Sequence, residues 1–127
     1  THPRTENAMS EAHYRHCRPD LLLQSVGGDR NTFMLLVDIF RRDTAEKLTG
    51  MRAALMRGER AQLAFSAHAL KGTVGPTGAD NLLQQLVELE TASRDPLAAL
   101  SEQALDELER QVARIREELE RFAAGLC

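Results

Sequence analysis

Apolar side chains in this chain recur at alternating steps of three and four residues over most of its length. That spacing places them on one side of an α-helix, which turns about 100° per residue. Leucine and alanine are abundant and only 4% of the residues are aromatic, which also favours helices over strands. The two longest stripes are Phe33, Leu36, Val37, Phe40, Thr44, Leu48, Met51 and Leu55, and then Leu105, Leu108, Val112, Ile115, Leu119 and Phe122.

Proline, glycine and aspartate mark where the first two helices begin and end. Pro19 stands where a proline is favoured in a first helical turn, and Gly27 and Gly28 end that short helix. Asp29 is a suitable N-cap for the next helix, because its carboxylate can accept a hydrogen bond from a free backbone N–H group. The long stripe then predicts a continuous helix as far as Gly58.

The remaining sequence predicts three more helices. One runs from about Glu59 to Val74, and the glycines and proline of residues 75–78 form a turn. Another begins at Ala79, and Asp95-Pro96 is expected to start the last. Short connections favour antiparallel neighbours. The predicted fold is therefore all-α: an antiparallel four-helix bundle with a short additional N-terminal helix.

The chain of 127 residues is long enough for one domain, which we assign to residues 18–127. Residues 1–17 have no clear period and are interpreted as a flexible leader. His13, His16 and Cys17 within it have the spacing of metal ligands on a helix. A leader without a metal is the simpler interpretation, and a metal-binding bundle is the least favoured of the functions considered.

Composition excludes several classes of function. The net charge of −3 argues against a nucleic-acid-binding protein, which usually carries a basic excess. Two cysteines do not suggest a disulfide framework, and a reducing compartment is the simpler interpretation. No apolar run approaches the roughly 18 residues of a membrane span, so direct membrane insertion is not expected.

One histidine lies on the outward side of the third predicted helix. With Leu63 set at zero on a helical wheel, His68 falls at about 140°, away from the predicted core side. Around it the wheel places residues with little or no side chain, and Phe65 as an apolar rim. A glycine inside a helix lowers stability by about 0.5–1 kcal/mol relative to alanine, so its presence needs a reason. Close approach of a partner to the helix at Gly72 is such a reason. The small neighbours are Ala61, Ala64, Gly72 and Gly75.

This arrangement suits a histidine that carries a phosphoryl group. An exposed imidazole is largely neutral at pH 7, and its outer nitrogen is a nucleophile toward phosphorus. Lys71, one turn further on, can bring an ammonium group toward the resulting negative charge. No P-loop, metal cage or general base is recognisable nearby. The sequence therefore predicts a chain that carries a phosphoryl group without activating one.

The residues that follow this histidine form a specific pattern, which resembles histidine-containing phosphotransfer (HPt) domains of multistep two-component phosphorelays. The likeness extends over about residues 19–122. The pattern reads His68-Ala69-Leu70-Lys71-Gly72, a stretch of small residues, Gly78 ten residues after the histidine, and a leucine-rich segment from Ala79 to Glu90.

The resemblance implies that His68 accepts a phosphoryl group from the aspartate of one receiver domain and passes it to the aspartate of another. It implies that Lys71 helps to hold this group, that Gly72 leaves room for docking and that Gly78 serves the turn. The receiver domains would supply Mg²⁺ and most of the catalysis. The chain would need no cofactor or metal of its own, and it is better described as a covalent intermediate than as an enzyme.

The sequence-based hypothesis is thus a monomeric phosphorelay carrier. Its expected partners are receiver domains, one of a hybrid histidine kinase and one of a downstream regulator. Its expected location is the cytoplasm, either free or as the cytoplasmic portion of a membrane-anchored hybrid kinase. The alternative is a non-catalytic helical adaptor that uses the same surface to bind a receiver or kinase domain as a regulator.

Overall fold

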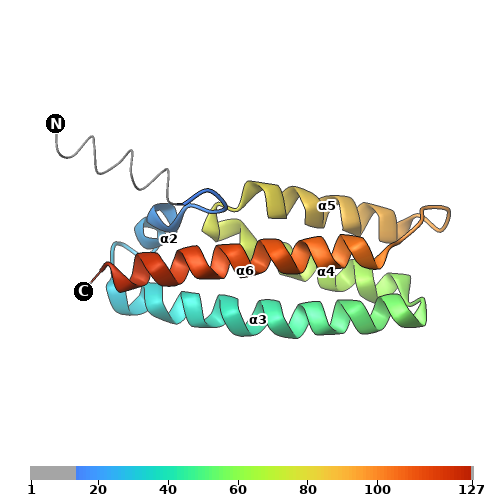
Figure 1. The fold of residues 1–127 in the computed structure, drawn as a ribbon, viewed down its shortest axis with the longest axis horizontal. Helices are drawn as coiled ribbons and strands as arrows, with labels where there is room; N and C mark the ends of the chain where they lie inside the picture. Colours follow the sequence, from blue (N-terminus) through green and yellow to red (C-terminus); the bar gives the residue numbers. More distant parts are fainter. Residues whose placement is uncertain (1–13, 127) are drawn as a thin grey trace.

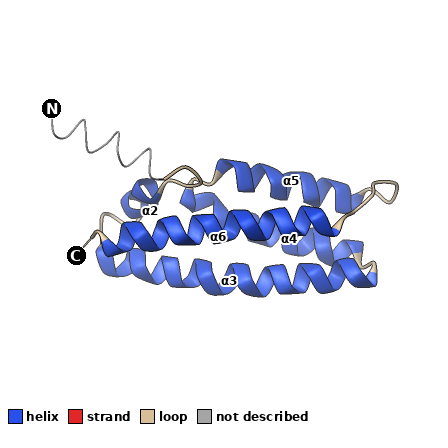
Figure 2. Cartoon of the chain, in the orientation of Figure 1, coloured by secondary structure: helices blue, strands red, loops and turns tan. Residues whose placement is uncertain are grey.

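A computed structural model of the chain describes residues 14–126. Every regular element in this range is helical, which confirms the predicted fold class (Figures 1 and 2). No helix within this range is long and apolar enough to cross a membrane. The elements are α2 (Pro19–Ser25), α3 (Arg30–Arg57), α4 (Arg60–Val74), the 3₁₀ helix η1 (Gly75–Thr77), α5 (Asp80–Arg94) and α6 (Glu102–Ala124).

The four long helices lie side by side as a bundle, and α2 packs at one end (Figure 1). Helix α3 borders α4 and α6, and α5 closes the ring by contacting α4 and α6. The short α2 contacts η1 and the neighbouring parts of α3 and α6. The element that carries the candidate histidine, α4, is therefore held between α3 and α5, and its remaining side faces solvent.

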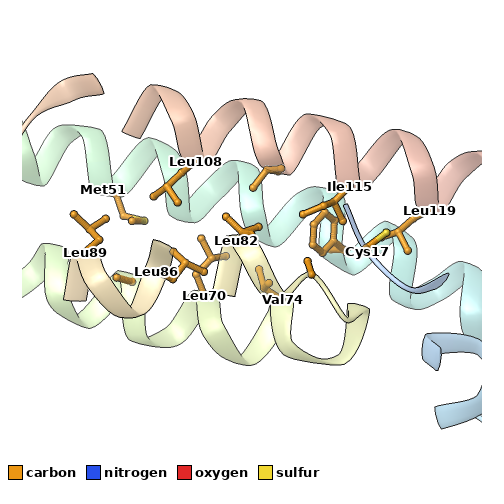
Figure 3. Packing of buried hydrophobic residues seen from close by; sticks show 14 of the residues in the cluster. Cys17, Met51, Leu70, Val74, Leu82, Leu86, Leu89, Leu108, Ile115 and Leu119 are labelled. Atoms are coloured by element: carbon orange, nitrogen blue, oxygen red, sulfur yellow. The ribbon is translucent and has the colours of Figure 1, made fainter. Parts of the chain in front are cut away.

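The interior is built from the stripes that the sequence pattern predicts. Leucine side chains from α4 and α5 meet Met51 of α3 and Ile115 of α6 in one continuous cluster (Figure 3). Residues of this size that lose all contact with water contribute roughly 1.5–3 kcal/mol each. The largest fully buried side chains are Phe33, Phe40, Met51, Leu63, Leu70, Leu82, Leu86, Leu105, Leu108, Ile115, Leu119 and Val74.

The long helix α3 begins and ends where its capping residues predict. The side chain of Asp29 accepts a hydrogen bond from the backbone N–H of Thr32, 2.9 Å away. At the other end Gly58 has a φ of +69°, a left-handed conformation that glycine adopts without steric cost.

The predicted start of the last helix is wrong. Helix α6 begins after Ser101, whose side chain accepts the first capping hydrogen bond, and not at Pro96. Asp95 instead caps a turn by accepting from the backbone N–H of Leu97. The guanidinium of Arg60 donates to three backbone carbonyls between residues 92 and 98 and holds this connection in a non-helical path.

The assignment of residues 1–17 to a flexible leader is also wrong for residues 14–17; residues 1–13 lie outside the described range. Cys17 is buried in the core, as Figure 3 shows. The buried carboxylate of Glu118 on α6 accepts hydrogen bonds from the backbone N–H groups of Arg15, His16 and Cys17. Burial would raise the pKa of Glu118, but the hydrogen bond from the His16 ring and these backbone bonds hold it below its ordinary value.

The turn after α4 contains Gly78, which has a positive φ like Gly58. The two glycines differ in their surroundings, so the effects of replacing each by alanine can be compared. Gly78 has a φ of +71°, and a Cβ placed there would lie 2.7 Å from the Cβ of Arg18. Gly58 has nearly the same φ but open space around it. We expect Gly58→Ala to lower the free energy of unfolding by about 1–2 kcal/mol and Gly78→Ala by about 1–3 kcal/mol more. Urea denaturation checks this, and equal losses would contradict the packing of Arg18.

Candidate functional site

The structure places His68 in the middle of α4 with 65% of its side chain exposed. The opposite side of α4 packs into the core, as the helical wheel predicts. Leu63, Ala67, Leu70 and Val74 are each at most 1% exposed. The burial of these four residues fixes the rotation of the helix, and this rotation turns the imidazole of His68 toward solvent.

A carboxylate from the neighbouring helix lies against this imidazole. Oε2 of Glu90, on α5, is 3.0 Å from Nδ1 of His68. The same oxygen is 3.0 Å from a guanidinium nitrogen of Arg94, and the other oxygen is 2.8 Å from Nζ of Lys71. One carboxylate therefore binds three nitrogen-bearing side chains from two helices.

Glu90 is much less accessible than the histidine that it contacts. Its side chain is 13% exposed, since it lies where α4 and α5 pack together. The hydrogen bond from Lys71 is the main cause that lowers its pKa to about 2, with further contributions from Arg94 and His68. The carboxylate is consequently ionised at all physiological pH values.

Acid is expected to weaken this cluster by protonating Glu90. Because its pKa is lower in the folded chain than the ordinary 4.5, the ionised group stabilises the fold fully above about pH 4.5. That contribution is lost progressively as the pH falls toward 2. We expect the difference in Tm between the wild type and Glu90→Gln to shrink over this interval in melts followed by circular dichroism. A constant difference would contradict the pairing.

The surface beside His68 is open, as the small residues predict. Ala61, Gly72 and Gly75 are all exposed. A Cβ added at Gly72 or Gly75 would meet no atom of the rest of the chain within 4 Å, beyond the adjacent residues and the backbone of its own helix, so packing against other parts of the chain does not require glycine at either position. Phe65 is 67% exposed and supplies a large apolar side chain on the same face.

Ala64 does not belong to this surface, which corrects the sequence-based prediction. It is only 1% exposed. It lies one turn before His68 on the side of α4 that faces α5, the helix that supplies Glu90. The wheel underestimated the width of the buried side, because α4 packs against two neighbours and not against one.

Sequence reasoning did not assign a role to Glu90 or Arg94. Glu90 follows Leu86 by one helical turn, and Leu82, Leu86 and Leu89 on this side of the helix are buried. A charged residue on an apolar stripe needs a partner, and that signal could have identified it. Arg94 follows one turn later and reaches the same carboxylate.

Within residues 14–126 no group of three or more histidine, cysteine, aspartate or glutamate side chains could hold a metal ion. Of the three residues with metal-ligand spacing, His13 lies outside this range. The ring of His16 contacts Glu118 at 2.6 Å. Burial raises the pKa of the Cys17 thiol well above its usual range.

The arrangement around His68 can support nucleophilic chemistry at one nitrogen. Nδ1 is engaged by Glu90, so Nε2, on the other side of the ring, is directed away from the carboxylate. Lys71 and Arg94 bind the same carboxylate as Nδ1, which brings two positively charged side chains to this part of the surface.

Comparisons with known proteins agree with this geometry. The family model described as Hpt domain matches residues 35–124. The chain therefore belongs to the Hpt domain family, and it is a phosphotransfer carrier of phosphorelays. Hpt domains of phosphorelays interact with receiver domains and are carriers, not catalysts in the usual sense.

A solved structure shows the same fold. The crystal structure of histidine-containing phosphotransfer protein B from Pseudomonas aeruginosa PAO1 superposes with a TM-score of 0.79 at 25% sequence identity. The match covers 87% of this chain and 96% of that one. A search of curated protein sequences finds no significant match.

Proposed function

We propose that His68 is the residue that carries the phosphoryl group. The observation that supports this most directly is its position: an exposed imidazole, bound at Nδ1 by Glu90, stands on an open surface of small residues. Nε2 attacks the phosphorus of a receiver's aspartyl phosphate. A nitrogen–phosphorus bond forms, the phosphorus–oxygen bond to the aspartate breaks, and the aspartate leaves as a carboxylate.

Under this proposal the chain provides the acceptor and the receiver provides the catalysis. Mg²⁺ would be bound by the receiver domain, and this chain would need no cofactor of its own. Nζ of Lys71 and Nδ1 of His68 bind the two oxygens of the same Glu90 carboxylate, and we expect the Lys71 ammonium group to turn toward a phosphoryl group on Nε2. Ala61, Phe65, Gly72 and Gly75 would form the surface against which the receiver docks.

We infer that two receiver domains use this surface in turn, one of a hybrid histidine kinase and one of a downstream regulator. The receiver that donates the phosphoryl group and the receiver that takes it both react at the His68 ring. Both therefore need access to the same surface. The proposed location is the cytoplasm. The alternative of a non-catalytic adaptor is not favoured, because the chain belongs to a family of phosphotransfer carriers.

Transfer from a labelled receiver domain tests this proposal. Receiver domains phosphorylated with ³²P-acetyl phosphate in the presence of Mg²⁺ are mixed with the full chain. We expect label to appear on the chain, to be lost in acid and kept in alkali, and to leave when an unlabelled second receiver is added. Docking without any transfer of label, across a panel of receivers, would favour the adaptor.

A further inference from the structure

Helix α5 separates the His68 site from a groove on its other side. Glu90 contacts His68 from the side of α5 that meets α4. Gln85, Glu88 and Ala92 follow one another at steps of three and four residues on the side that meets α6. Helix α5 packs less closely against α6 than against α4, and a groove of about 300 Å³ remains between α5 and α6. This groove is distinct from the site already described.

Most of the residues that line the groove are apolar. The groove lies beside the loop that joins α5 to α6, at the end of the bundle away from α2 (Figure 1). The buried side chains of Leu89 and Leu108 form its floor. Its volume is at the lower end of the range of small-molecule sites, which is about 300–1,000 Å³, so it suits a compact ligand. The apolar lining residues are Leu89, Ala92, Ala99, Leu100, Ala104 and Leu108.

The charged side chains of the lining are both acidic. Glu88 comes from α5 and Glu107 from α6, and no lysine, arginine or histidine is among the described residues that line the groove. Glu107 binds Arg110 at 2.7 Å, a contact that lowers the pKa of Glu107 and offsets part of its charge. Glu88 is exposed, accepts a hydrogen bond from Gln84 and forms no ion pair within residues 14–126. Glu88 therefore supplies most of the uncompensated negative charge beside the groove.

The uncharged polar side chains of the lining are Gln85 and Ser101. The Ser101 hydroxyl accepts the capping hydrogen bond of α6. Oε1 of Gln85 is buried and has no hydrogen-bond partner in the described part of the chain. A buried acceptor without a donor is unfavourable and uncommon. A donor group held in the groove would give this carboxamide a partner once its side chain rotates. The polar groups thus complement a ligand that donates hydrogen bonds and carries positive charge.

We propose that the groove between α5 and α6 binds a small organic cation, whose compact apolar body lies on the leucine floor and whose ammonium group lies within reach of Glu88 and Glu107. An anion of the same shape is repelled by these carboxylates, and a neutral molecule lacks the attraction. A ligand here contacts α5 on the side away from His68 and leaves the receiver surface open. The inference is independent of the function proposed for His68.

Titration of the ¹⁵N-labelled chain with three probes of similar shape tests this inference by NMR near pH 7. The probes are cyclohexylmethylammonium, cyclohexylmethanol and cyclohexanecarboxylate. We expect the ammonium to cause saturable shifts of backbone amides within residues 85–92 and 99–108. Its affinity should exceed that of the alcohol by about fivefold to tenfold, as two partly exposed ion pairs would give, and the carboxylate should not bind. Equal affinities for the ammonium and the alcohol, or shifts outside these segments, would overturn the inference.

Removal of the two carboxylates tests the charge selection. The double variant Glu88→Gln/Glu107→Gln should bind the ammonium about fivefold to tenfold more weakly and the alcohol as the wild type does. The matched control is Glu117→Gln/Glu120→Gln, which makes the same change in charge at exposed positions of α6 outside the groove. An equal loss of affinity in the two double variants would show a non-specific effect of net charge and would contradict the site.

A side chain that fills the groove tests its location. Ala104 is exposed and lines the groove, so Ala104→Leu should fold and should weaken binding of both the ammonium and the alcohol by about tenfold or more. Ala113→Leu adds the same side chain to an exposed position of α6 outside the groove and should leave both affinities unchanged. Thermal melts check the fold of each variant. Wild-type affinity in folded Ala104→Leu would overturn the inference and leave the proposed function intact.

Discussion

The substitution His68→Gln is expected to abolish acceptance of the phosphoryl group while the bundle remains folded. Glutamine has no nucleophilic ring nitrogen, whereas its size and polarity suit an exposed position. Because 65% of the His68 side chain is exposed, we expect the free energy of unfolding to change by only about 0.5 kcal/mol. Transfer of ³²P from a phosphorylated receiver measures the first effect, and urea denaturation measures the second.

A second histidine provides the control for this experiment. His16 is the other histidine in the described part of the chain, and its ring contacts Glu118 at the end of the bundle where α2 packs. The variant His16→Gln should accept the phosphoryl group at the wild-type level, even where it loses some stability. Acid-labile label on His68→Gln, or loss of labelling in His16→Gln alone, would contradict the assignment of the acceptor.

The other large effect is expected from a bulky side chain at Gly72. The space around this position is open, so Gly72→Leu should fold as well as the wild type. A leucine there would stand between His68 and an approaching receiver. We expect transfer to fall by about tenfold or more, which corresponds to a loss of about 1.4 kcal/mol in docking. Stopped-flow or quenched transfer assays with one receiver measure this loss.

Two further variants separate an effect of Gly72→Leu on docking from an effect on folding. Gly72→Ala should raise the free energy of unfolding by about 0.5–1 kcal/mol, because alanine is the better helix former and meets no clash. Ala113→Leu adds a leucine to an exposed position of α6, a helix that borders α3 and α5. It should leave transfer unchanged. An equal loss of transfer in Ala113→Leu, or a loss of stability in Gly72→Leu that matches its loss of transfer, would contradict the docking role.

The helices and the outward direction of His68 follow from local sequence, because both depend on the spacing of apolar residues along one helix. The spacing of Leu63, Ala67, Leu70 and Val74 defines the buried side of α4, and the position of His68 relative to these residues requires no knowledge of other helices. The N-cap Asp29 and the glycine at position 58 are equally local signals. These features could therefore be predicted from the sequence.

The features that sequence reasoning missed depend on contacts between distant segments. Glu90 reaches His68 only because α4 and α5 pack in one particular register. Ala64 is buried by that same packing. Cys17 is held by a carboxylate 101 residues later, and no local pattern indicates such a pair. The N-cap of α6 is Ser101 and not a residue near Pro96, because the Arg60 guanidinium binds backbone carbonyls of the preceding loop.

Locating the phosphoryl group on the phosphorylated chain tests the central claim most directly. The chain is labelled by a receiver, digested at alkaline pH, and analysed by tandem mass spectrometry, while ³¹P NMR of the intact protein reports the bonded nitrogen. We predict one phosphoryl group, on Nε2 of His68. A phosphoryl group on any other residue, or on Nδ1 of His68, would contradict the account.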